Sequence, residues 1–419
     1  MTSATHPGDT AVLRRQSQPG SFGPFQLQQL VLLEIAAALL LVAYAVDPLL
    51  LIPAACVAVA LVLLAVTRRR QRAVTEWLTT ALALRRRARR GAQPIPADTD
   101  PALAPVVECD PALRTYAFIT DSTGERRSIG MIGDGTFLTA VLRIQGPDAP
   151  LRAARTERPL PLGLLNDALE VDDVRLESVQ VVQHTQPAPA PHLPEQAVAA
   201  RSYAPLQAQT GTPAVRLTWV ALKLDPELCR EAIEARGGGL EGTQRCLLRA
   251  VDQLASRLTG AGFRASALGE DELVAAVSTS AGANPQATAQ ASGSDQSARR
   301  TVETARAWRC DDRWHTTYWV RRWPQLGSGA GAAQLPQLVA LLTSSPALAS
   351  TFSLTLGRGS GRAPALSGHV RITGRSDDEL VAARRELERT ARGVKVGLVR
   401  LDREQLPGVL ATLPLGGTR

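Results

Sequence analysis

Lysine is almost absent from this chain of 419 residues, and aromatic residues make up only 4% of it. Only Lys223 and Lys395 occur, so arginine carries nearly all of the positive charge. The net charge is +8, but residues 1–92 hold eleven arginines against four acidic residues, which accounts for most of the excess. A domain that binds duplex nucleic acid needs a concentrated basic face to displace counterions. Because the remaining residues are nearly neutral, we expect no nucleic-acid partner.

Cysteine is also scarce, and its spacing excludes a disulfide framework. The five cysteines are odd in number, and none belongs to a CxxC motif. They are Cys56, Cys109, Cys229, Cys246 and Cys310. We expect reduced thiols that pack as small hydrophobic side chains.

The common catalytic signatures are missing. The sequence contains no GxxxxGK[ST], HExxH or GxSxG motif. The glycine-rich stretches at residues 130–135 and 357–369 lie at or between predicted strands, where glycine serves a turn and does not open a helix. We therefore assign no catalytic residue, no cofactor and no metal.

One short segment nevertheless combines residue types that bind transition metals. Residues 310–315, CDDRWH, include Cys310, Asp311, Asp312 and His315. An Asp-Asp pair between two strands is equally typical of a turn, and no second ligand cluster is near in the sequence. If the protein were instead a membrane-anchored transferase acting on envelope precursors, Asp311, Asp312 and Asp134 would be the acids to test.

Two apolar runs near the N-terminus predict a membrane hairpin over residues 27–67. Residues 30–46 contain one charge, Glu34, and residues 49–66 contain none. At about 1.5 Å per residue, each run reaches roughly 26 Å. The first run is longer than the core of a signal peptide, and Asp47-Pro48 between the runs is typical of a tight turn.

Arginines flank this hairpin at both ends, and the positive-inside rule then orients it. Both termini and the main body are expected in the cytosol, with the protein in the bacterial cytoplasmic (inner) membrane. The second helix is predicted to continue as a basic stalk over residues 68–92. The stalk could contact lipid, a partner or RNA. Glu34 is either an interfacial acid or a polar contact to another subunit. The candidate partner or membrane contacts are Glu34, Asp47, Pro48, Arg68, Arg69, Arg70, Arg72, Trp77, Arg85, Arg86, Arg87, Arg89 and Arg90.

Linkers rich in proline, alanine, glycine or serine divide the rest of the chain. We expect an α+β cytosolic body of mixed sheets and amphipathic helices. Strands near 214–224 and 366–373 are each followed by a long helix, a short strand and another helix, which indicates a duplicated strand-helix unit. The expected segments are a tail at 1–26, the hairpin at 27–67, the stalk at 68–92, a first unit at 106–279, a flexible linker at 280–300 and a second unit at 301–419.

Several phrases of the sequence resemble one protein family. They are PGSFGPFQLQQLVLLE (19–34), RRRQR (68–72), IGMIGDGTFLTAVLRI (129–144), the stretch 159–191, which begins PLPLGLLNDALE, and TYWVRRWP (317–324). Together with the hairpin that turns at Asp-Pro, they look like the EccE component of type VII (ESX) secretion systems. The resemblance spans most of the chain and depends on the order of these phrases.

The resemblance implies a non-catalytic structural subunit of a membrane export machine. Its partners would be subunits of the EccB, EccC and EccD types, with the ATPase activity belonging to EccC, together with the phospholipid bilayer. No catalytic residue carries over, because the family has no catalytic motif. The alternatives are the membrane-anchored transferase and a regulator that binds lipid or RNA through residues 85–90.

Overall fold

The structure is a computed structural model of the whole chain. It describes residues 14–15, 21–22, 25–46, 51–66, 68–69, 72–90, 96, 99–122, 125–146, 159–186, 196–198, 201–202, 205, 215–291, 299–324, 334–344, 347–359 and 365–417. Residues 15–93 form one compact unit, and residues 94–419 with the first fourteen residues form the other. The two units are described separately.

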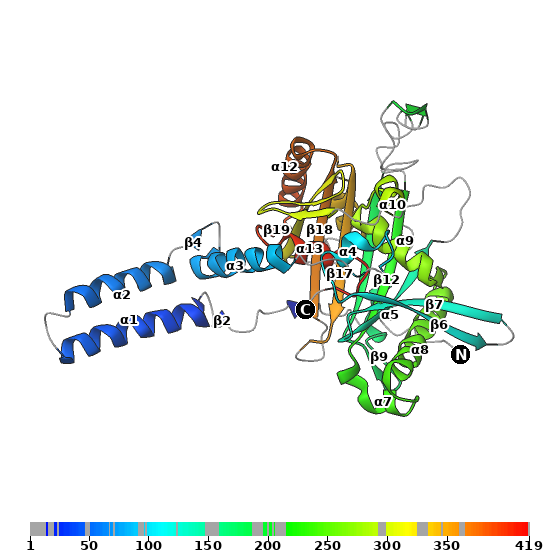
Figure 1. Cartoon of the computed structure of the whole chain (residues 1–419), viewed down its shortest axis with the longest axis horizontal. Helices are drawn as coiled ribbons and strands as arrows, with labels where there is room; N and C mark the ends of the chain where they lie inside the picture. The colour runs from blue at the N-terminus through cyan, green and yellow to red at the C-terminus, as the bar shows by residue number, and fades with distance from the viewer. Residues whose placement is uncertain are drawn as a thin grey trace, which may run out of the picture. The chain divides into compact units, whose positions relative to one another are not determined.

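The N-terminal segment contains a pair of helices and a third, basic helix (Figure 1). Helices α1 and α2 pack side by side, and the small residues Ala36, Ala43, Ala54 and Ala58 are buried among their described side chains. Alanine at such positions lets two helix backbones approach closely. The short strand β1 (Arg14–Arg15) lies at the boundary between the two units. The other elements are β2 (Ser21–Phe22), β3 (Phe25–Gln26), α1 (Leu27–Val46), α2 (Leu51–Val66), β4 (Arg68–Arg69), β5 (Arg72–Ala73) and α3 (Val74–Arg90).

The membrane hairpin predicted for residues 27–67 is not supported. Among the residues that the structure describes, no helix combines the length and the apolarity needed to cross a bilayer. Helix α2 has 16 residues and so rises about 24 Å, less than a hydrocarbon core of about 30 Å. Helix α1 carries the acidic Glu34 among its described side chains. The cytosolic orientation inferred from that hairpin loses its basis.

The larger unit is a mixed α/β structure built on one large sheet. Its strands are β6 (Arg114–Ser122), β7 (Glu125–Gly133), β8 (Leu138–Gln145), β11 (Ser178–Gln186), β12 (Val215–Leu224), β13 (Arg264–Ala267), β14 (Thr301–Glu303), β15 (Trp308–Cys310), β16 (Arg313–Arg322), β17 (Ala349–Gly357), β18 (Ala365–Gly374) and β19 (Gly397–Arg400). A separate small ribbon pairs β9 (Glu170–Val171) with β10 (Val174–Arg175).

The helices of this unit are α4 (Ala104–Val107), α5 (Leu162–Asp167), the 3-10 helix η2 (Pro226–Cys229), α7 (Arg230–Glu234), α8 (Gly239–Gly260), α9 (Glu270–Ala281), α10 (Pro285–Ala291), α11 (Leu335–Thr343), α12 (Asp377–Gly393) and α13 (Gln405–Leu410).

The two halves of the sheet have the same strand topology, counted from each edge toward the centre. The order is β14-β15-β16-β18-β17-β11-β12-β8-β7-β6, and the short strands β13 and β19 add to β8 and β16 respectively. Each half therefore consists of a three-stranded meander, a helix, a hairpin, a long helix, a short strand and a final helix. The halves meet where β11 pairs with β17, with Ser178 opposite Gly357. The expected mixed sheets are corrected to one antiparallel sheet, because every strand pairing within it for which a register is described is antiparallel.

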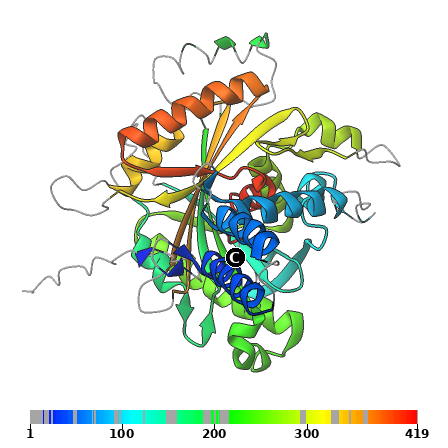
Figure 2. The same ribbon diagram turned by 90° about the vertical axis from the view of Figure 1, so that its left-hand side faces the viewer.

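Helices cover both faces of the sheet. Helices α5, α8, α11 and α12 share the larger hydrophobic core with one face. Helices α4, α9 and α13 share a second core with the other face. Figure 2 shows the long α12 in orange and the short α13 in red on opposite sides of the strands. Alternating residues of each strand supply the two cores, as the period of two in a β-strand requires.

The second face is polar at its centre, and the C-terminal segment covers it. Gln180 donates from Nε2 to the carbonyl oxygen of Ala411 at 2.9 Å, and its Oε1 accepts from the Gly416 amide at 2.8 Å. Ser178 donates to the Gly416 carbonyl at 2.6 Å, and Ser353 to that of Ala411 at 2.8 Å. Buried polar side chains thus hold a strap of irregular chain whose backbone groups would otherwise lack partners.

Candidate interaction surfaces

The residues proposed as partner contacts lie mainly in the N-terminal unit. Glu34 is exposed on α1. Arg68 and Arg69 form β4, Arg72 begins β5, and Trp77 lies in α3. Asp47, Pro48 and Arg70 lie outside the described residues.

Helix α3 presents the most concentrated positive charge among these candidates. Leu82, Arg85, Arg86 and Arg89 are exposed, and their spacing of three, four and seven residues puts them on one helix face. Arg87 is half-buried, and Arg90 is the last residue of the helix. The exposed face therefore combines three guanidinium groups with one leucine, a pattern suited to an anionic surface.

Asp134, one of the three acids considered for catalysis, caps its own turn. Its Oδ1 accepts hydrogen bonds from the amide of Thr136 at 2.8 Å, from the Thr136 hydroxyl at 2.7 Å and from the amide of Phe137 at 3.3 Å. The next residue, Gly135, has φ of +91°. The carboxylate is thus engaged in turn chemistry between β7 and β8.

Asp311 is buried in an ion pair. Its carboxylate accepts from Nε of Arg300 at 2.9 Å and from Nη2 at 2.8 Å, and also from the amide of Asn284 at 2.7 Å. Both side chains are less than a tenth exposed. Glu108 accepts from the amides of Arg300 and Thr301, each at 2.8 Å, which fixes α4 against β14. Asp311 therefore acts as a structural counterion.

The CDDRWH segment does not form a convergent cluster. Asp312 is about half exposed and pairs with Arg313 at 3.3 Å. His315 lies on β16, where its Nδ1 is 3.0 Å from the hydroxyl of Thr373. Burial raises the pKa of the Cys310 thiol well above its usual value, so the thiol stays protonated. Within the described ranges, no group of three His, Cys, Asp or Glu side chains could hold a metal ion.

A charged surface on α8 was not anticipated from the sequence. Three arginines anchor α8 and the preceding loop to the segment 167–173. Arg236 binds Asp173 through two bonds of 2.7 Å, Arg249 lies 2.9 Å from Asp172, and Arg257 pairs with Asp167 at 3.3 Å. The sequence signals were Asp172-Asp173 in a turn and arginines spaced along the helix, but only the fold brings them together.

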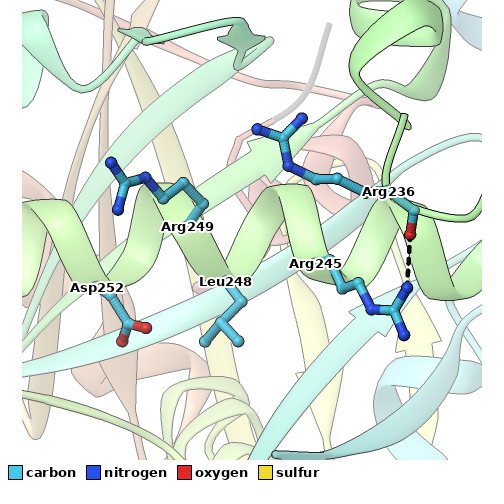
Figure 3. A pocket seen from close by; sticks show the side chains of 5 residues that line it. All are labelled: Arg236, Arg245, Leu248, Arg249 and Asp252. Carbon is cyan, nitrogen blue, oxygen red and sulfur yellow. Dashed lines mark hydrogen bonds between the residues drawn. The ribbon is translucent and has the colours of Figure 1, made fainter. Parts of the chain in front are cut away.

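A shallow hollow of about 380 Å³ lies on this surface (Figure 3). It is lined by Arg236, Arg245, Leu248, Arg249 and Asp252. Nη1 of Arg245 donates to the carbonyl of Arg236 at 2.7 Å, and Arg127 pairs with Asp252 at 2.9 Å. Each of the three arginines has an acidic or carbonyl acceptor, so the hollow carries mixed charge.

The segment that contains this hollow matches a known family. Residues 212–320 match the family model described as "EccE: Putative type VII ESX secretion system translocon, EccE". This segment is similar to the EccE domain. The EccE resemblance expected from the sequence is confirmed over these residues, which run from β12 through α8 and α9 to β16 and so join the two halves of the sheet. No curated protein matches the chain.

Proposed function

We propose that this protein is a non-catalytic structural subunit of a type VII secretion translocon. The similarity to the EccE domain at residues 212–320 carries this proposal, because the family implies a component of that translocon. Two of the acids that an enzyme would need, Asp134 and Asp311, are engaged in a turn and in a buried ion pair. These contacts favour a scaffold role over the transferase alternative.

The proposed partners are membrane subunits of the EccB, EccC and EccD types, with anionic phospholipid headgroups as a second contact. The exposed arginines of α3 support this proposal, because they are available to acidic side chains or to phosphate groups. The mixed-charge face of α8 is less suited to lipid, since acidic residues already neutralise its arginines. It fits a protein partner with charges of both signs.

A pull-down from gentle detergent tests the scaffold role. The tagged full chain should recover a multidomain ATPase and a polytopic subunit in a fixed ratio, and a deletion strain should lose export. Recovery of the chain alone, together with normal export in the deletion strain, would contradict the proposal.

A matched pair of triple variants tests the α3 face. Arg85→Glu, Arg86→Glu and Arg89→Glu together should weaken binding of the full chain to vesicles containing phosphatidylglycerol by at least about 100-fold, at roughly 1 kcal/mol per arginine. The control changes three exposed arginines of α12 to glutamate and should bind nearly as well as wild type. Those three are Arg385, Arg389 and Arg392. Equal losses in both variants would show that only net charge matters.

A further inference from the structure

Arg371 on β18 is a fully buried cation. Its side chain has no measurable exposure, and it projects from the sheet face that α9 and α13 cover. Nη2 donates to the carbonyl oxygen of Ser280, and lies 3.3 Å from the Ser280 hydroxyl and 3.4 Å from that of Thr351. The other two nitrogens, Nε and Nη1, have no hydrogen-bond acceptor among the described residues.

Among the residues that the structure describes, no carboxylate forms an ion pair with Arg371. Three other buried cations of the larger unit have acidic partners: Lys223 has Glu177 at 3.3 Å, Arg300 has Asp311 and Arg313 has Asp312. Burial lowers the pKa of Arg371 to about 10, with the neighbouring Cys310 as the only group acting in the opposite direction. Arg371 is therefore still charged at neutral pH, while the Cys310 thiol is protonated. An uncompensated buried charge is too costly to remain without a counter-charge.

The groups around Arg371 add further donors. Thr317 on β16 lies directly opposite Arg371 in the sheet, and its hydroxyl has no partner among the described residues. Two guanidinium nitrogens and a hydroxyl on neighbouring strands therefore require an acceptor.

His184 contributes no competing charge. Its Nδ1 lies 2.8 Å from the Thr351 hydroxyl, which also accepts from Arg371. Burial, together with the smaller effect of the Arg371 charge, lowers the pKa of His184 to about 3. The imidazole is therefore neutral at pH 7.

The geometry points to a buried binding site for a small monovalent anion, chloride, held by Nε and Nη1 of Arg371 and the hydroxyl of Thr317. A halide suits the site because it accepts several hydrogen bonds and donates none, and because it supplies the missing negative charge. A water molecule would bring two protons into a region where donors already exceed acceptors. The site is independent of the translocon role proposed above.

Bromide substitution on the full chain tests the proposal directly. Crystals grown in sodium bromide should show an anomalous difference peak within hydrogen-bonding distance of Arg371. Wild-type protein should also melt at least about 2 °C higher in sodium chloride than in sodium methanesulfonate of equal ionic strength, because the anion binds only the folded state.

Variants separate this site from general salt effects. Arg371→Met should lose the difference between chloride and methanesulfonate, and Thr317→Val, which keeps the charge, should reduce it. Arg127→Met removes the same charge from a surface ion pair and should leave the difference intact. If Arg371→Met does not fold, Thr317→Val and the bromide peak decide the matter.

Two results would overturn the assignment. One is the absence of a bromide peak at Arg371 together with equal melting in the two salts. The other is a peak without any chloride-dependent stability, which would mark an adventitious ion only.

Discussion

The buried pair of Arg300 and Asp311 gives the most demanding prediction, which concerns Asp311→Asn. The substitution keeps the size of the side chain but removes its charge. Three hydrogen bonds of 2.7 to 2.9 Å converge on that carboxylate, and both partners are nearly inaccessible to solvent. Without the carboxylate, Arg300 is left as an uncompensated charge in the interior.

The expected cost is about 3–5 kcal/mol in the free energy of unfolding, which is the range for a buried ion pair that loses one partner. For a domain of this size, that corresponds to a fall in melting temperature of about 4–7 °C. Thermal unfolding followed by circular dichroism, together with urea denaturation, measures both quantities.

The neighbouring Asp312→Asn is the matched control. Asp312 is 46% exposed and its pair with Arg313 is partly screened, so the expected cost is less than about 1 kcal/mol. The double variant Arg300→Met/Asp311→Leu should be more stable than Asp311→Asn alone, because it removes both charges. If Asp311→Asn costs no more than Asp312→Asn, the reasoning from burial is refuted.

Three further predictions test other parts of the fold. Gly130→Ala should destabilise the protein by about 1–3 kcal/mol in urea denaturation, since its Cβ would lie 2.6 Å from the backbone of Glu270; an unchanged midpoint would argue against that close approach. Burial lowers the pKa of His184 to about 3 and that of His369 to about 4, whereas both imidazoles have a pKa near 6.5 in the unfolded chain. The free energy of unfolding should therefore keep its full value above about pH 6.5 and decrease as the pH falls toward 4. His369→Asn should flatten this loss in denaturation measured from pH 7 to 4, and an unchanged slope would show that His369 does not contribute. Gln180→Ala should cost about 1–3 kcal/mol and increase amide hydrogen exchange in residues 411–416, because the Gly416 amide loses its acceptor and the Ala411 carbonyl keeps only Ser353; unaltered exchange there would contradict the anchoring role.

Local patterns in the sequence were sufficient for several elements. The apolar spacing of Leu247, Val251, Leu254 and Leu258 predicts helix α8, and all four side chains are buried. The Gly-Asp-Gly turn at residues 133–135 predicts the hairpin of β7 and β8. The local phrases also indicated the EccE family, which the match at residues 212–320 confirms. These features depend on residues close together in the chain, so the sequence contains enough information to recognise them.

Apolar composition alone gives a wrong prediction for the N-terminal segment. It predicts a membrane hairpin over residues 27–67, and none of the described helices is long and apolar enough to cross a bilayer. Composition reports the apolarity of a segment, but the length of each helix depends on where its backbone hydrogen bonds end.

Only the tertiary structure decided which polar residues meet. The sequence alone determined the periodic helices, the tight turns and the lack of catalytic motifs. It left Asp311 as a candidate catalytic acid, and it did not single out Arg371. The pairing of Asp311 with Arg300 and the burial of Arg371 opposite Thr317 arise from strand register across the sheet. Register joins residues that are up to hundreds of positions apart, because it is set by the burial of whole faces, and no local pattern encodes it.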